Sequence, residues 1–297
     1  VGYSSLSANT VGHSNVAVGS SALLSNTEGL YNVAVGPNSL DANTEGNSNV
    51  GIGYAALGAN TEGNQNVAVG PSAMIANISG DYNVAVGALS LDANTTASFN
   101  TAVGYGTLTT NTTGTANVAM GRNALLSNTT GDNNVSIGSL SLDANTEGNS
   151  NVAVGYAALS TNTTAGNNVA VGYETLKLNT TGSNNTALGY QALEANTDGH
   201  SNVAVGTNAL IANTEGTQNV AVGRLALDAN TTASYNTAVG YATLTANTTG
   251  ASNVAMGRNA LLVNTIGYSN VAIGVLSLTA NTDGFNNTAV GRDAGGA

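Results

Sequence analysis

Apolar and polar positions recur along this chain with a fixed period of 17 residues. The segment Asn32 to Ser48 (NVAVGPNSLDANTEGNS) is followed by Asn49 to Gln65 (NVGIGYAALGANTEGNQ) without insertion or deletion. A fixed period of this size is typical of a solenoid, in which each copy forms one coil and contacts only its neighbours. The period therefore predicts the architecture before any single residue is considered.

The repeat extends over the whole chain. Sixteen full copies cover residues 15–286, and partial copies cover residues 1–14 and 287–297. We therefore expect a single uninterrupted solenoid of about 17 coils over residues 1–297, which would reach roughly 80 Å if straight. Because the first and last copies are incomplete, we expect the sequence to be a fragment of a longer chain.

The first part of each coil alternates like a β-strand. Numbering each coil from its first Asn makes Asn32 position 1 and Ser48 position 17. Position 2 is Val or Thr, position 3 is nearly always Ala, position 4 is Val, Ile, Met or Leu, and position 5 is Gly. The pattern predicts a short strand with positions 2 and 4 on one face and position 3 on the other. We expect the valines to fill the core, leaving Ala153 and Ala170 on an outer apolar face that another chain covers.

The second leg of each coil has a different spacing. Position 8 is Ala, Ser or Thr, and position 9 is Leu in 16 coils and Met74 in one. Restricted positions at 5, 8, 9 and 12 follow helical spacing, and Pro37 and Pro71 suit a first helical position. A helix is about 10 Å wide, whereas stacked strands repeat every ~4.8 Å, so an irregular bend is the alternative. In either case Leu142 and Leu159 are predicted to lie in the core.

Two Asn positions are invariant within the repeat. Positions 1 and 12 are Asn in every copy that contains them. Amides stacked at strand spacing can hydrogen-bond along the axis, so Asn151 and Asn162 are predicted to belong to ladders. Asn162 and Asn179 also begin Asn-x-Thr sequons, a match that an Asn-Thr-Thr repeat produces automatically. The coil closes with Asn-Thr-x-Gly, as in Asn43 to Gly46, where the Gly is predicted to supply a positive φ. Three copies replace or shift this Gly: they carry Ala97, Ala165 and Ala233.

Composition narrows the class of protein. Only 7% of residues are charged, so Asn, Thr, Ser and Gly must provide solubility, and the net charge of −11 argues against a nucleic-acid partner. The chain has no cysteine and therefore no disulfide framework. No apolar run approaches the roughly 20 residues that span a bilayer, so this segment is not expected to insert into a membrane.

The sequence offers no arrangement of residues typical of catalysis. The only histidines, His13 and His200, share position 16 but are eleven coils apart, too far to form one site. We expect no catalytic, cofactor or metal site and no cofactor. The carboxylates Glu28, Glu45 and Glu62 recur at position 14 and could recruit Ca²⁺, but the Gly-Gly-x-Gly-x-Asp pattern of calcium-binding rolls is missing. A solvated acidic stripe is the simpler interpretation.

Position 6 carries the larger exposed side chains. Its arginines are too sparse for a basic groove, and its tyrosines either stack on sugar rings or cover the adjacent turn. The arginines are Arg122, Arg224, Arg258 and Arg292. The tyrosines are Tyr3, Tyr54, Tyr105, Tyr156, Tyr173, Tyr190 and Tyr241.

These positions resemble a known family of repeats. The stretch Gly29 to Ser39 (GLYNVAVGPNS) is similar to the head repeats of trimeric autotransporter adhesins of the YadA type, whose core reads Gly-x-x-Ser-Val-Ala-Ile-Gly-x-x-Ser. The resemblance implies a parallel β-roll, assembly of three parallel chains and display on a bacterial surface. Arrays with a 17-residue period also resemble parts of phage tail fibres. The period of this chain is longer than that of the adhesin heads.

Three functions are compatible with this pattern. The first is a non-enzymatic structural rod or head segment of an extracellular adhesin, fibre or filament, on a cell or virion surface, that self-associates as a homotrimer or fibre. The second is a head that binds a surface glycan or another receptor. The third is ice binding, because position 13 is Thr in every coil except at Ile78.

Overall fold

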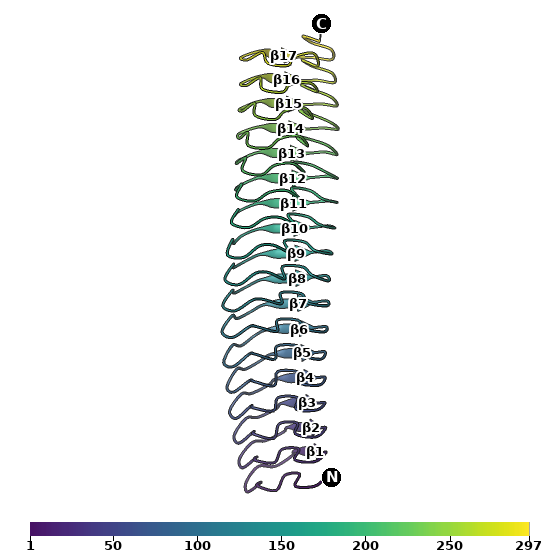
Figure 1. The fold of residues 1–297 in the computed structure, drawn as a ribbon. Helices are drawn as coiled ribbons and strands as arrows, with labels where there is room; N and C mark the ends of the chain where they lie inside the picture. Colours follow the sequence, from purple (N-terminus) through teal and green to yellow (C-terminus); the bar gives the residue numbers. More distant parts are fainter. Residues whose placement is uncertain (297) are drawn as a thin grey trace. The chain divides into compact units, whose positions relative to one another are not determined.

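The structure is a computed structural model that describes residues 1–296, in two compact units: Val1–Ser150 and the part that begins at Asn151. In both units, positions 2 to 4 of successive 17-residue coils form three-residue strands (Figure 1). The first unit contains β1 (Val16–Val18), β2 (Val33–Val35), β3 (Val50–Ile52), β4 (Val67–Val69), β5 (Val84–Val86), β6 (Thr101–Val103), β7 (Val118–Met120) and β8 (Val135–Ile137). The second contains β9 (Val152–Val154), β10 (Val169–Val171), β11 (Thr186–Leu188), β12 (Val203–Val205), β13 (Val220–Val222), β14 (Thr237–Val239), β15 (Val254–Met256), β16 (Val271–Ile273) and β17 (Thr288–Val290). The predicted parallel β-solenoid of 17-residue coils is confirmed.

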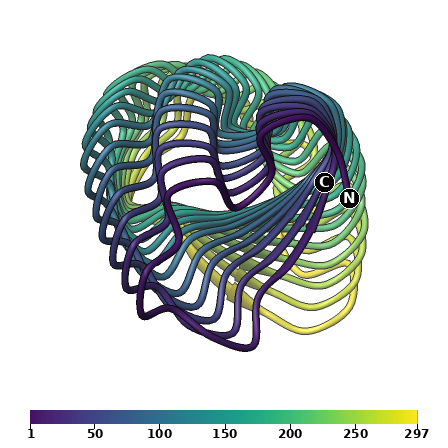
Figure 2. The ribbon, with the colours of Figure 1, turned by 90° about the horizontal axis from the view of Figure 1, so that it is seen from below.

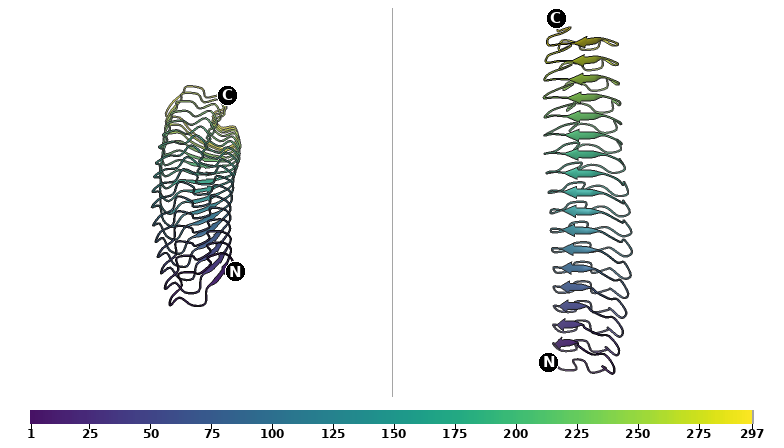
Figure 3. Two further views of the ribbon diagram at one scale, coloured as in Figure 1. Left: turned by 60° about the horizontal axis from the view of Figure 1, so that its bottom comes forward. Right: turned by 180° about the vertical axis from the view of Figure 1, so that it is seen from behind.

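The strands of each unit stack in register. Within a unit, each strand pairs in parallel with the strand of the next coil, so that Val33–Val35 of β2 lies opposite Val50–Ile52 of β3. The same pairing joins β12 to β13 in the second unit. Within each unit the strands point the same way (Figure 3), and successive coils follow a similar outline when viewed along the stack (Figure 2). Each position of the repeat therefore becomes a row of equivalent side chains.

The second leg of the coil is a series of turns, and residues 1–296 contain no helix. The predicted helical turn is therefore wrong, and the irregular alternative is correct. Positions 7 and 9 have positive φ, as at Asn208 (57°) and Leu210 (52°), whereas a right-handed helix needs negative φ throughout. The N–H groups of this leg also bond between coils: Leu210 donates to the Ala226 carbonyl at 3.0 Å. Bonding at strand spacing leaves no room for a helix about 10 Å wide.

The interior of each coil is narrow, and small side chains line it. Ala153 and Ala170 are 0% exposed, so the prediction that position 3 forms an outer face is wrong. The reason is steric. A Cβ added to Gly51, which replaces this Ala in β3, would lie 2.6 Å from Ser39 Oγ and 3.3 Å from Leu40 Cγ. Beside Ser39 and Leu40 the interior has no room even for a methyl group without a shift, and the larger side chains of positions 2 and 4 face outward, although their apolar area is greater.

Leucine at position 9 fills the space opposite the alanines. Leu142 and Leu159 are both 0% exposed, as predicted, and Met74 is equally buried in the one full coil that lacks Leu. Small side chains at position 3 and at position 8 leave room for this single large side chain. The core is therefore a stack of Leu side chains against small residues, rather than two interdigitated rows of valines.

The predicted ladder of Asn side chains at position 12 is confirmed. Asn213 Nδ2 donates to Asn196 Oδ1 at 2.9 Å and to the Gly216 carbonyl at 3.0 Å, and Asn213 Oδ1 accepts from Asn230 Nδ2 at 2.8 Å. The three Asn side chains are fully buried. Each amide thus connects its coil to the coils before and after it and also closes its own turn.

The Asn residues at position 1 form a second ladder with a different geometry. The Asn202 backbone N–H donates to Asn185 Oδ1 at 3.0 Å, and Asn202 Nδ2 donates to the Gly216 carbonyl at 2.8 Å. The side-chain oxygen therefore bonds to the backbone of the next coil, and the amide nitrogen joins the start of the coil to its closing turn. Because both Asn rows are buried and hydrogen-bonded, neither side chain can be lost without leaving polar partners unpaired.

Removing one ladder amide is expected to destabilise the second unit. Asn213→Ala should lower the free energy of unfolding by about 1–3 kcal/mol, because the Asn196 and Asn230 amides lose a buried partner. Chemical denaturation followed by circular dichroism measures the change. Thr207→Ala, at an exposed position 6, is the control and should have almost no effect. Equal stability of the two variants would contradict the ladder.

The two glycine positions of the repeat serve different purposes. Gly46 at position 15 has negative φ, so the predicted positive φ at this turn is wrong. Glycine is needed there for space, because an added Cβ would lie 2.4 Å from Asn43 Oδ1. The positive φ occurs instead at position 5, as at Gly53 (132°), in a region that L-residues rarely adopt.

Candidate functional site

The outward face of the strands is apolar and only partly covered. Positions 2 and 4 project away from the interior and are half-buried or exposed in the strands of both units. In the first unit Val86 is 36% exposed and Met120 41%, and in the second unit Leu188 is 47% exposed and Met256 42%. We call this the strand face: the side chains of positions 2 and 4 in β1–β17. It gives each unit two parallel rows of apolar side chains along consecutive coils.

The tyrosines of position 6 stack on one another wherever they occupy consecutive coils. The rings of Tyr156 and Tyr173 have centroids 5.3 Å apart, and those of Tyr173 and Tyr190 are 5.4 Å apart, with interplanar angles of 17° and 6°. The Arg224 guanidinium lies 5.7 Å from the Tyr241 ring centroid. Where tyrosines stack, much of each ring face is covered by the next ring, which leaves less of it for a sugar.

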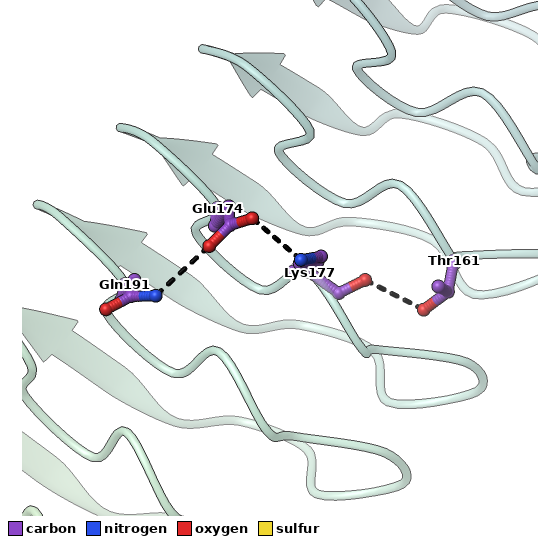
Figure 4. A network of polar contacts seen from close by, with 4 residues as sticks. All are labelled: Thr161, Glu174, Lys177 and Gln191. Carbon is purple, nitrogen blue, oxygen red and sulfur yellow. Dashed lines mark hydrogen bonds and ion pairs between the residues drawn. The ribbon is translucent and has the colours of Figure 1, made fainter.

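A short polar network lies beside the stacked tyrosines. Lys177 Nζ donates to Glu174 Oε1 at 2.7 Å, Gln191 Nε2 donates to Glu174 Oε2 at 3.0 Å, and Thr161 Oγ1 donates to the Lys177 carbonyl at 2.8 Å (Figure 4). The hydrogen bond from Lys177 lowers the pKa of Glu174, and the Glu174 carboxylate raises the pKa of Tyr173. These bonds connect three consecutive coils along the outer edge of the second leg.

A third ladder runs along position 16, which sequence reasoning did not identify. The Asn47 N–H donates to Asn64 Oδ1 at 2.9 Å, and the Asn64 N–H donates to Asp81 Oδ1 at 2.6 Å. Further along, the Thr217 N–H donates to Ser234 Oγ at 2.9 Å. The residue type varies, but Asn, Asp and Ser recur, and their short polar side chains readily accept bonds from nearby backbone N–H groups. The recurrence of short polar acceptors at position 16 was the feature of the sequence that could have predicted this ladder.

Aspartates at position 10 are held in an unfavourable environment. Burial raises the pKa of Asp92, Asp143 and Asp228, although hydrogen bonds from the backbone partly oppose the shift. The Oδ1 atom of each is buried and has no hydrogen-bond partner. Where position 10 is Thr, the hydroxyl does find a partner: Thr245 Oγ1 donates to the Leu225 carbonyl of the preceding coil at 3.2 Å.

Replacing one of these aspartates is expected to stabilise the protein in a pH-dependent way. In Asp228→Thr the new hydroxyl should donate to the Asn208 carbonyl, as Thr245 does to Leu225, and raise the free energy of unfolding by about 1 kcal/mol at pH 7. Because folding raises the Asp228 pKa, the folded wild type binds the proton more tightly and loses stability as pH rises from about 3.9 through the raised value. The gain should therefore shrink near pH 4.

Urea unfolding of the two proteins at pH 4 and pH 7 measures this difference. Glu215→Thr removes the same charge from an exposed position 14 of the second unit and serves as the control for net charge. If Asp228→Thr and Glu215→Thr show the same pH dependence, burial of the Asp228 carboxylate is not the cause.

The remaining sequence candidates, three glutamates and two histidines, lie at exposed positions of their coils. Glu28, Glu45 and Glu62 are exposed. The His13 and Tyr31 rings are T-shaped to each other, with centroids 5.7 Å apart, and His200 lies in the second unit with its Nδ1 3.4 Å from Ser201 Oγ. Among residues 1–296 no group of three or more His, Asp or Glu side chains is placed to hold a metal ion.

The position-13 threonines are hydrogen-bonded within the fold, and the sequon asparagines are buried in it. At position 13, Thr27 Oγ1 donates to the Thr44 carbonyl of the next coil at 3.2 Å, and Thr214 Oγ1 donates to Thr231 in the same way. Such hydroxyl protons are directed along the stack and not toward solvent. Asn162 and Asn179, which begin two of the sequons, are 0% exposed, so their side chains are inaccessible to a glycosyltransferase in the folded protein.

Neither the models of known protein families, nor the curated proteins, nor the solved structures include a match to this chain. In the part of the chain that the structure describes, no helix has the length and apolar character needed to cross a bilayer. The surfaces of the chain are therefore the basis for inferring its function.

Proposed function

We propose that this chain is a non-enzymatic structural segment of an extracellular adhesin, fibre or filament, and that it associates with further copies of itself through the strand face. The observation that carries the proposal is the exposure of apolar side chains at positions 2 and 4 in consecutive coils of both units. A soluble monomer rarely leaves apolar rows of this length uncovered.

The area of the strand face supports a second copy as its partner. If each partly exposed side chain offers about 50 Å², the eight strands of the first unit present on the order of 800 Å², the area that one partner buries in a standard interface. The apolar groups repeat at strand spacing, about 4.8 Å. A second copy presents the same spacing and can therefore match every coil, whereas a partner without this period matches only a few.

The composition of the chain and its resemblance to adhesin repeats support the proposed extracellular, structural role. A chain with 7% charged residues and no cysteine is compatible with an exposed structural array, and the similarity to adhesin head repeats suggests three parallel chains. Because Ala153 and Ala170 are buried, we propose the valine side of the strand as the contact, in place of the alanines that the sequence favoured.

The oligomeric state tests the proposal directly. The wild-type chain should sediment as an oligomer in analytical ultracentrifugation, and Val203→Lys with Val220→Lys should weaken the assembly by placing charges on the strand face. The matched control is Thr232→Lys with Thr249→Lys, which adds the same charge at the exposed position 14 of neighbouring coils.

A fold-compatible variant separates association from folding. Val203→Thr with Val220→Thr uses the residue that already occupies position 2 in β11 and β14, so the strand should form while apolar contact area is lost. A wild-type chain that sediments as a monomer at every concentration would overturn self-association. So would an assembly that none of the strand-face variants alters.

A further inference from the structure

Three stacked tyrosines on the second unit form a cluster that the structural role does not use. Tyr156 and Tyr173 are each 45% exposed and Tyr190 is 49% exposed, so the rings are accessible at their edges. Their centroids lie 5.3 and 5.4 Å apart. The 17-residue register maintains this arrangement, because equivalent residues of consecutive coils are stacked directly.

We propose that Tyr156, Tyr173 and Tyr190 form an oxidative cross-linking site, at which a haem peroxidase using hydrogen peroxide joins adjacent rings as dityrosine. Each of two phenols loses one electron and its hydroxyl proton to give a phenoxyl radical. The radicals couple through a new carbon–carbon bond between positions ortho to the hydroxyls, and the ortho hydrogens then move to the oxygens. The two electrons and two protons reduce one hydrogen peroxide to two waters, so the step balances.

The geometry favours coupling at this site over the other tyrosines. Radical coupling requires two phenols together, and holding them in contact replaces a bimolecular encounter by an intramolecular one. Tyr54 occupies position 6 between Pro37 and Pro71, and Tyr105 occupies it between Ala88 and Arg122, so neither has a second phenol in an adjacent coil of that row. Both are nevertheless 57% exposed, which makes them matched single tyrosines.

A dityrosine would give the chain a covalent link between coils, which its composition otherwise lacks. The chain has no cysteine, so no disulfide can join one coil to the next. A dityrosine between Tyr173 and Tyr190 closes a covalent ring across one coil and would oppose unwinding in the way that a disulfide constrains an unfolded chain. This inference does not depend on the strand face or on the proposed oligomer.

Tryptic mapping can detect the site without ambiguity. Cleavage after Arg122, Lys177 and Arg224 places Tyr156 and Tyr173 as the only tyrosines of residues 123–177, and Tyr190 as the only one of residues 178–224. After treatment of the folded chain with peroxidase and hydrogen peroxide, mass spectrometry should find the first peptide with two hydrogens missing, or the two peptides joined. Mixing unlabelled and ¹⁵N-labelled chains distinguishes links within a chain from links between chains.

Two substitutions make the test decisive. Tyr173→Phe keeps a stacked ring but removes the central phenol, so both products should be lost, whereas Tyr54→Phe should leave them unchanged.

Tyr268 stacks on Phe285 with centroids 5.0 Å apart and an angle of 2°, so Phe285→Tyr should create a new link within residues 259–292, where Tyr268 is otherwise the only tyrosine. The proposal is overturned if wild-type links are absent from residues 123–224, join only different chains, or persist in Tyr173→Phe. Failure of the folded Phe285→Tyr variant to gain a link would likewise show that stacking does not direct coupling.

Discussion

Gly53→Ala is expected to prevent the coils around β3 from stacking, with a loss of at least about 3 kcal/mol in the free energy of unfolding of the first unit. Gly53 has a φ of 132°, which a residue with a side chain rarely adopts. An added Cβ would also lie 2.6 Å from the carbonyl oxygen of Gly70 in the next coil. The unfavourable φ and the short contact both involve the backbone, so neither can be relieved by rotating a side chain. Thermal unfolding followed by circular dichroism measures the effect.

Gly58→Ala is the matched control, because it lies five residues further along the same chain. Gly58 has no positive φ, and a Cβ there would lie 3.3 Å from the Ala55 carbonyl oxygen and 3.5 Å from Asp41 Oδ1. This substitution is expected to be neutral or to stabilise by roughly 0.4–1 kcal/mol through the unfolded state. Similar destabilisation in the two variants would mean that position 5 is not specially constrained.

Leu210→Ala is expected to lower the free energy of unfolding of the second unit by about 2–5 kcal/mol, the usual range for a buried Leu. Leu210 is 0% exposed and is the only large side chain that its coil places in the interior. Because a repeat array can open locally, hydrogen exchange should be followed in addition to the melting curve. The amides of residues 203–227 should lose protection first.

Leu210→Met tests whether packing volume is the cause. Met74 occupies the equivalent position in another coil and is 0% exposed, so this volume-conserving change should cost less than about 1.5 kcal/mol. If Leu210→Ala unfolds at the same temperature as the parent, position 9 does not provide the core.

The sequence was sufficient wherever one position of the repeat could be interpreted by itself. The invariant Asn at positions 1 and 12 predicted buried ladders, and the near-invariant Leu at position 9 predicted the core. Each is a single residue type whose chemistry admits few roles: a stacked amide pairs along the axis, and a large aliphatic side chain is buried. The parallel strand followed from the alternation at positions 2 to 4.

The sequence was insufficient where two positions competed for the same space. The greater apolar area of Val152 and Val154 favoured placing them inside, but Ala153 is the residue of this strand that is fully buried, in the same interior as Leu159. Which residue faces inward depends on the separation of the two walls of the coil, which no single position encodes. Packing without overlap outweighed the gain from burying more apolar area.

The second leg was also misjudged for a physical reason. Restricted positions at helical spacing arise in Leu210 and Asn213 because both point inward from a tight turn, and not because a helix brings them together. Left-handed φ at a Leu is unusual and costs roughly 1 kcal/mol or more, so no sequence rule would place it there. The bonds that each coil makes to its neighbours maintain the conformation.

The in-register pairing also limits how such a chain can change in evolution. Every ladder joins a residue to the one 17 places away, as Asn213 is joined to Asn196 and Asn230. Insertion or deletion of 17 residues therefore leaves each row intact, whereas 16 or 18 residues would displace both Asn rows and turn the strand over. Residues 83–114 recur closely at 219–250, an offset of 136 residues or eight periods. Genetic change can lengthen the array only in whole coils, so its length is quantised while its cross-section stays the same.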